Sequence, residues 1–109
     1  MSTHHRLLLV SLLACCASGV AFAGQESTIF TYDGKDFVRS QTTLVTEDGK
    51  SSVNTKLEHN QPAYNALIKK HPYSGKVTVF GQKCDAKYAP LTDARGGLTG
   101  ALFVGMCTK

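Results

Sequence analysis

The chain has 109 residues, of which 42% are hydrophobic and 18% charged, so it holds enough apolar material for one small folded domain and is not a disordered polymer. Ten glycines and three prolines are too few for a collagen-like or low-complexity chain. The formal net charge is +4, a moderate excess that allows a basic surface without requiring one.

The first 23 residues have the three parts of a secretory signal peptide. Arg6 supplies the positive charge, residues 7–17 form an apolar or small-residue run, and Ala21-Phe22-Ala23 is a small-x-small cleavage site. The apolar run is shorter than the roughly 20 residues that a bilayer-spanning helix needs. We therefore expect residues 1–23 to be removed, leaving residues 24–109 as a single domain without a membrane span, in the periplasm or secreted.

A second reading of the same segment is a lipoprotein signal. Leu12-Leu13-Ala14-Cys15 approximates the box that precedes an acylated cysteine. Such a protein would keep Cys15, lipidated, and would be a surface-anchored protein with a structural role. Leu13 stands where a smaller residue is commoner, so the later Ala-x-Ala site is favoured.

The cysteines that remain after cleavage predict one disulfide. Cys15 and Cys16 leave with the signal, whereas Cys84 and Cys107 form an even pair in an oxidising compartment. Metal binding or thiol chemistry would favour a Cys-x-x-Cys pair or a histidine close by in sequence, and neither cysteine has one. We expect a structural Cys84–Cys107 bridge, and neither a metal site nor a cofactor.

The N-terminal half predicts an antiparallel meander. Runs of β-branched and aromatic residues indicate strands, and Asp-Gly pairs mark the tight turns between them. The expected strands are residues 28–32, 37–46 and 52–58, with turns at residues 33–36 and 47–50. The third strand has the clearest alternation of apolar and polar residues.

One helix and two further strands follow. Asn60 is a candidate N-cap and Pro62 suits a first helical turn, so the sequence predicts a helix over residues 62–70 that Pro72 ends. Residues 76–84 and 98–107 are expected to be antiparallel strands, joined by an irregular loop at residues 85–97. The predicted fold is α+β: a small antiparallel sheet of four to five strands with one helix packed on it, stapled by the disulfide.

The C-terminal half carries the excess of positive charge. Residues 61–109 contain seven Lys or Arg and two Asp, whereas residues 24–60 contain four basic and six acidic residues. Lys83, Lys87 and Arg95 lie in or beside the expected loop and are the candidate binding residues. They suit a protein or an anionic envelope component. No module pattern for nucleic acid is present, and we expect a monomer.

Catalytic patterns are weak. Only His59 and His71 remain after cleavage, and neither has a sequence neighbour that predicts a tuned acid or base. No Gly-x-Ser-x-Gly motif occurs, and the paired carboxylates lie in turns where Asp is explained by turn chemistry. The sequence therefore predicts a small exported, non-catalytic binding module. The alternative is a small secreted hydrolase that uses one of the two histidines.

Overall fold

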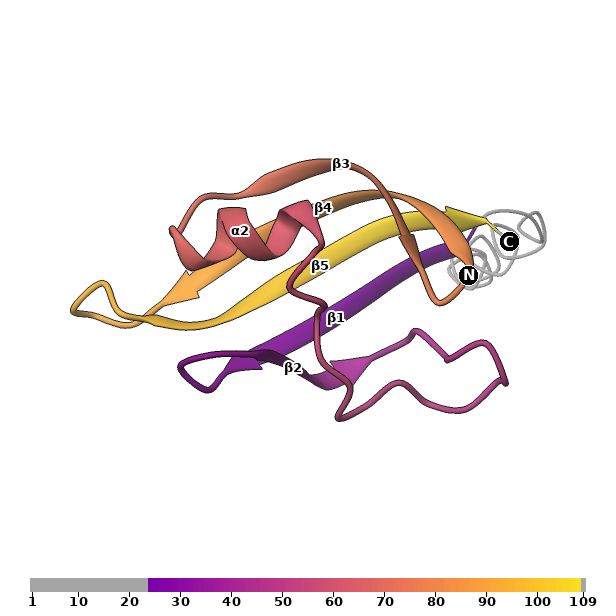
Figure 1. Cartoon of the computed structure of the whole chain (residues 1–109), viewed down its shortest axis with the longest axis horizontal. Helices are drawn as coiled ribbons and strands as arrows, with labels where there is room; N and C mark the ends of the chain where they lie inside the picture. The colour runs from indigo at the N-terminus through magenta and orange to yellow at the C-terminus, as the bar shows by residue number, and fades with distance from the viewer. Residues whose placement is uncertain (1–23, 109) are drawn as a thin grey trace, which may run out of the picture.

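A computed structural model describes residues 24–108, which form one antiparallel sheet and one short helix (Figure 1). The sheet has five strands in the order β2-β1-β5-β4-β3, and every neighbouring pair is antiparallel. The elements are β1 (Gly24–Tyr32), β2 (Phe37–Thr42), α2 (Pro62–Ile68), β3 (Tyr73–Val79), β4 (Gln82–Thr92) and β5 (Leu98–Thr108). The expected sheet with a single helix and one disulfide is confirmed.

The two faces of the sheet differ sharply in burial. Along β4 and β5 the side chains alternate between buried and exposed, as the period of two of a strand requires. The buried face, called here the covered face, holds the aromatic core. Its aromatic members pack against one another in edge-on, stacked and tilted pairs: Phe30, Phe37, Tyr88 and Phe103.

The connection from β2 to β3 supplies the cover, because it carries α2 across this face (Figure 1). Ala63 and Leu67 are fully buried beneath the helix. Pro62 lies in the first turn as expected, but the N-cap is Gln61 rather than Asn60, and its side chain makes no capping bond. The helix ends at Ile68, and Lys70 takes a positive φ of 63° just beyond it.

The prediction of a third strand over residues 52–58 is wrong. Asn54 has a φ of 75°, and the Thr55 N–H bonds to the Ser52 carbonyl, so a turn interrupts the extended backbone. Only two isolated bridges remain in this part of the chain, Val38 with Lys56 and Val45 with Ser51. The residues after the turn still follow the edge of β2: the Arg39 N–H donates to the Thr55 carbonyl at 2.8 Å.

The expected irregular loop at residues 85–97 is also wrong. β3 ends at Val79, a tight turn follows at Phe80 (φ 48°) and Gly81 (φ 80°), and β4 then runs to Thr92. Two consecutive positive φ values match a hairpin turn that follows the right-handed twist of the strands. The expected strand 76–84 therefore belongs to two strands, and the loop shrinks to a turn at residues 93–97.

The disulfide prediction is confirmed. Cys84 and Cys107 face each other on β4 and β5 with their Cα atoms 4.0 Å apart, and both are buried. The expected pairing of residues 76–84 with 98–107 holds only at this end, since most of β5 pairs with residues 85–92.

The expected signal peptide, residues 1–23, lies outside the described residues, so its removal stays a prediction. Within residues 24–108, no helix is long and apolar enough to cross a membrane.

Candidate functional site

A buried arginine lies on the covered face, near one edge of the sheet. Arg39 is on β2, and only 4% of its surface is exposed. It points inward because it pairs with Phe30, an inward-facing residue of β1, just beyond an irregularity in the β1–β2 register. Arginine is rarely fully buried unless its charge is paired. Arg39 is therefore a candidate ligand-binding residue.

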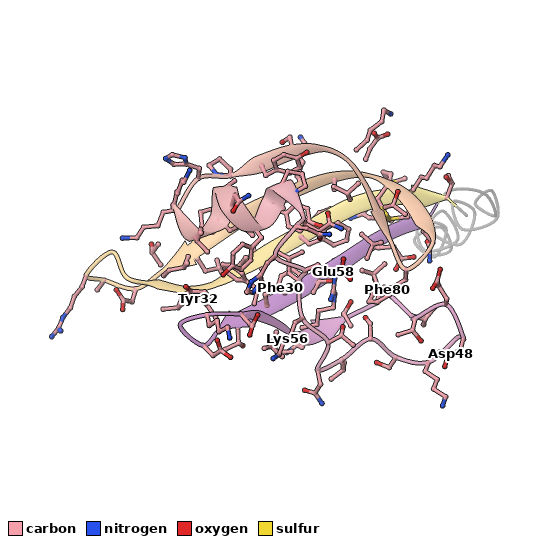
Figure 2. All side chains as sticks on the ribbon, viewed as in Figure 1. Phe30, Tyr32, Asp48, Lys56, Glu58 and Phe80 are labelled. Carbon is pink, nitrogen blue, oxygen red and sulfur yellow. A yellow bond between two sulfur atoms is a disulfide. The ribbon has the colours of Figure 1, made fainter. Side chains whose placement is uncertain are left out.

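Aromatic rings and the connecting segment hold the guanidinium in place. Figure 2 labels the two rings, Phe30 and Phe80. Its Cζ lies 5.2 Å from the centroid of Phe30 and 4.9 Å from that of Phe80, within cation–π range. Nη1 donates hydrogen bonds to Thr55 Oγ1 at 3.0 Å and to the Lys56 carbonyl at 3.1 Å. The side chain is thus oriented from both sides.

The guanidinium nevertheless lacks a counter-charge. Within residues 24–108 no carboxylate forms an ion pair with Arg39, and its buried Nε–H has no hydrogen-bond partner. Burial lowers the pKa of Arg39 from its ordinary value, while the nearby Tyr88 and Glu58 oppose that shift. Arginine remains protonated even so. The covered face therefore contains a fixed positive charge with an unused donor.

A small cavity of about 80 Å³ opens beside this group. Its inner wall is formed by buried residues, Arg39, Leu57, Val79 and Tyr88, and its outer wall by more exposed ones, Lys56, Glu58, Gln61, Thr78 and Phe80. The volume is well below the roughly 300 Å³ at which pockets for drug-sized molecules begin. It suits a ligand of a few heavy atoms.

Tyr88 completes the polar lining. It is 2% exposed, and burial raises the pKa of its phenol to about 12, against an opposing effect of Arg39. The phenol is therefore neutral at physiological pH and retains its O–H donor. The two polar residues of the inner wall, Arg39 and Tyr88, are accordingly a charged and a neutral hydrogen-bond donor.

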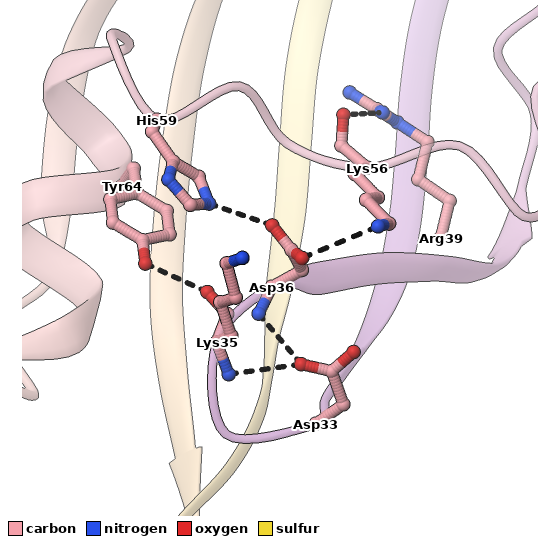
Figure 3. Close-up of polar contacts among 7 residues, drawn as sticks. All are labelled: Asp33, Lys35, Asp36, Arg39, Lys56, His59 and Tyr64. Atoms are coloured by element: carbon pink, nitrogen blue, oxygen red, sulfur yellow. Dashed lines mark hydrogen bonds and ion pairs between the residues drawn. The ribbon is translucent and has the colours of Figure 1, made fainter.

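A second cluster fastens the connecting segment to the β1–β2 turn (Figure 3). The Asp36 carboxylate bonds to His59 Nε2 at 2.6 Å and pairs with Lys56 Nζ at 3.3 Å. His59 stacks on Tyr64 with ring centroids 4.1 Å apart, and the Tyr64 hydroxyl donates to the Lys35 carbonyl at 2.7 Å. This cluster, called here the clasp, ties the start of α2 to the sheet beside the Arg39 cavity.

The electrostatics of the clasp favour ionised carboxylates. The hydrogen bond from His59, followed by contacts with Lys56, lowers the pKa of Asp36. Asp33 Oδ1 accepts the backbone N–H groups of Asp36 and Lys35, and these bonds lower the pKa of Asp33 in turn. Lys56 is engaged by Asp36, so Arg39 is the cation left without a counter-charge at this cavity.

The structure separates the three candidate binding residues. Lys83 and Lys87 lie on β4 with exposed side chains on the opposite, uncovered face, whereas Arg95 is in the exposed β4–β5 turn. In that turn Asp93 Oδ1 accepts the backbone N–H groups of Arg95 and Gly97. The three residues therefore do not form one loop, and their role in binding stays a prediction.

The two histidines differ in their surroundings. Both side chains are exposed; His59 nevertheless contacts Asp36 and Tyr64, which its sequence neighbours did not predict, and His71 lies beyond the end of α2. His59 follows a turn, so sequence spacing gave no sign of its distance to Asp36. Among residues 24–108, no group of three or more His, Cys, Asp or Glu is placed to hold a metal ion.

Arg39 is not among the binding residues predicted from the sequence. It could have been recognised because it lies in a predicted strand, two residues after Phe37, and so on the same face as that apolar residue. An ionisable residue at a core position of an alternating strand is a recognisable candidate.

Comparison with known protein families supplies the context. The family model described as the Cache 3/Cache 2 fusion domain matches residues 20–109. The chain belongs to this family. No curated protein and no solved structure matches it.

Cache domains are extracellular or periplasmic sensory modules that bind small-molecule ligands, and they are generally non-catalytic. The membership supports the expected binding module and, at a coarse level, the expected exported location. It supports a small-molecule ligand, and it does not show the expected protein or envelope partner.

Proposed function

We propose that this Cache domain is a non-catalytic receptor module that binds a small carboxylate in the Arg39 cavity. The observation that carries the proposal is the buried guanidinium, which has an unpartnered Nε–H and no carboxylate partner within residues 24–108. A bound carboxylate would supply the missing negative charge.

The chemistry of the group favours a carboxylate in particular. A guanidinium offers a planar fork of donors that matches the two oxygens of a carboxylate. Nη1 already donates to Thr55 and Lys56, whereas the buried Nε has no hydrogen-bond partner. A neutral amide of the same shape would leave the charge uncompensated, and we expect the cavity to discriminate strongly against it.

The size and lining of the cavity restrict the rest of the ligand. About 80 Å³ corresponds to roughly three water molecules at their liquid volume, so the organic part is limited to a few carbon atoms. Leu57, Val79 and Phe80 offer apolar contacts to such a group. A short-chain monocarboxylate such as acetate or propionate meets these conditions.

The test is a titration of the purified protein with formate, acetate, propionate and acetamide. Calorimetry measures the binding, and thermal unfolding measures the Tm at each ligand concentration. We expect saturable binding of at least one carboxylate, with a rise in Tm that follows its concentration. Acetamide, which has the size of acetate without the charge, should not bind. Equal shifts with acetate and acetamide would contradict the proposal without any substitution being made.

Two substitutions make the test specific. Arg39→Lys keeps a positive charge but loses the fork, and Arg39→Met removes both, so we expect affinity to fall by on the order of tenfold or more in each. Arg95→Gln is the matched control, because Arg95 is an exposed arginine in the β4–β5 turn. Carboxylate binding that survives in Arg39→Met, or that disappears in Arg95→Gln, would refute the assignment.

The exported location follows the same proposal. A receptor for an external small molecule must be outside the cytoplasm, and the signal peptide expected at residues 1–23 would place it there. Mass spectrometry of the mature protein tests this. A start at Gly24 agrees with it, and an acylated start at Cys15 would indicate the lipoprotein instead.

A further inference from the structure

The face of the sheet opposite α2, called here the uncovered face, carries a continuous apolar row. It contains four of the large apolar side chains that stay substantially exposed: Ile29 (40%), Leu102 (38%), Val104 (45%) and Met106 (48%). Ile29 lies directly opposite Leu102, and Ala89 flanks Leu102 on its other side. Such a concentration on one face is typical of an interaction surface.

Positive charge borders this row on one side only. Lys87 lies opposite Val104 on β4, and Lys83 is exposed on the same face four residues earlier. Asp85, the acidic residue between them, is held by Lys76 Nζ at 2.9 Å. On the other side, β1 presents uncharged polar residues at the exposed positions: Gln25, Ser27 and Thr31.

The same face is hollowed next to Met106. A concave region of about 390 Å³ is lined there by Lys76, Thr78, Lys83, Asp85, Met106 and Thr108, together with Val77 and Cys84. It joins Met106, at the end of the apolar row, to Lys83. A concave apolar surface with a basic border fits a convex, amphipathic element.

The dimensions agree with a helix. The row from Leu102 to Met106 spans five strand residues, so the first and last Cα atoms are about 14 Å apart. A helix of about ten residues has the same length and presents an apolar stripe of matching width. If acidic side chains follow one flank of that stripe, they meet Lys83 and Lys87.

A second copy of the chain fits less well. Two uncovered faces placed together would set the lysine border either against its own copy or against the uncharged side of β1. Neither arrangement brings a free carboxylate to Lys87, since Asp85 is already paired with Lys76. A flat lipid surface fits less well too, because the hollow beside Met106 curves away from it.

We propose that the uncovered face binds an amphipathic helix of a partner protein with acidic residues along one flank. The apolar row buries the helix stripe, and Lys83 and Lys87 pair with its acidic flank. This surface is separate from the Arg39 cavity, which lies on the covered face. Failure of one proposal therefore does not decide the other.

The test uses two synthetic 18-residue helical peptides with the same leucine stripe, one with glutamates and one with lysines along the same flank. Binding to the purified protein is followed by fluorescence anisotropy at two salt concentrations. We expect the glutamate peptide to bind on the order of tenfold more tightly than the lysine peptide, with the difference shrinking at high salt. Equal binding of the two peptides would overturn the proposal.

Substitutions then locate the surface. Lys87→Glu should reverse the preference between the peptides, and Val104→Asp should abolish the binding of both. Val53→Asp is the matched control, because Val53 is equally exposed (40%) but lies in a turn outside the sheet. Circular dichroism checks that each variant is folded. A preference that is unchanged in Lys87→Glu would refute the assignment even if Val104→Asp failed to fold.

Two competing occupants are outcomes of the same series. Phosphatidylglycerol vesicles that bind the protein as tightly as the glutamate peptide, and lose it in Val104→Asp, would overturn the proposal in favour of a membrane. Sedimentation that shows a dimer lost in Val104→Asp would overturn it in favour of a second copy.

Discussion

Replacing both Cys84 and Cys107 with alanine should lower the free energy of unfolding by about 3 kcal/mol at 25 °C. The bridge joins residues 23 apart in sequence, and the entropy of closing a loop of that length in the unfolded chain accounts for this magnitude. Alanine is chosen because both positions are buried, and a serine hydroxyl there would add a desolvation cost.

The size of the domain makes this loss large. One kcal/mol shifts the Tm of a domain of this size by about 4–8 °C, so the double variant should melt about 12–24 °C below the parent. A small domain buries a modest fraction of its unfolded surface and has little stability in reserve. We expect the variant to remain folded at 10 °C and to be substantially unfolded well below the parent's Tm.

Urea unfolding followed by circular dichroism measures the effect, with the reduced parent protein as the control. The reduced parent and the double variant should have similar free energies of unfolding, and their m-values should exceed that of the oxidised parent, because an uncrosslinked chain unfolds more extensively. A loss below about 1 kcal/mol in both would refute the argument from chain entropy. It would mean that the unfolded β4–β5 region stays compact without the bridge.

Three further outcomes are expected. The hydrogen bond from His59 lowers the pKa of Asp36 below its ordinary value of 3.8. The ionised carboxylate therefore stabilises the fold above pH 3.8, and this stabilisation is lost as the pH falls through the lowered pKa. Urea unfolding at a series of pH values should show this decline in the free energy of unfolding, and Asp36→Asn should flatten it. Leu67→Ala, at a fully buried position under α2, should cost about 2–5 kcal/mol in the same assay. Gly100→Ala should cost about 1–3 kcal/mol, since a Cβ there would clash with the Phe30 backbone carbonyl oxygen, and an unchanged midpoint would contradict that clash.

Local patterns predicted several elements correctly because their causes are local. The Asp-Gly pair at residues 33–34 suits a positive φ, and Gly34 has one of 102°. Pro62 begins a helix because its missing N–H is not needed in the first turn. The Cys84–Cys107 pair was predicted by elimination, since cleavage of residues 1–23 leaves no other cysteine.

Two errors concern the β3–β4 hairpin, where a turn was predicted as strand and most of β4 was predicted as loop. Phe80-Gly81 is a hairpin turn inside a run that reads as one strand, because phenylalanine is unusual at positive φ. The alternation of buried Cys84, Ala86 and Tyr88 with exposed Lys83 and Lys87 was present in the sequence, and Pro90 and the later glycines obscured it. Pro90 is tolerated near the end of β4.

The sequence by itself determined a small domain with one disulfide and a sheet that carries one helix, because the cysteine count and the strand, turn and helix patterns follow from local chain chemistry. Removal of a signal peptide stays a prediction from the pattern of residues 1–23. Only the tertiary structure decided where charge meets apolar surface. It turned Arg39 inward between Phe30 and Phe80, brought His59 to Asp36 across 23 residues, and set Lys83 and Lys87 beside an exposed apolar row. Those placements depend on the register of strands far apart in sequence, and register is a property of the whole sheet.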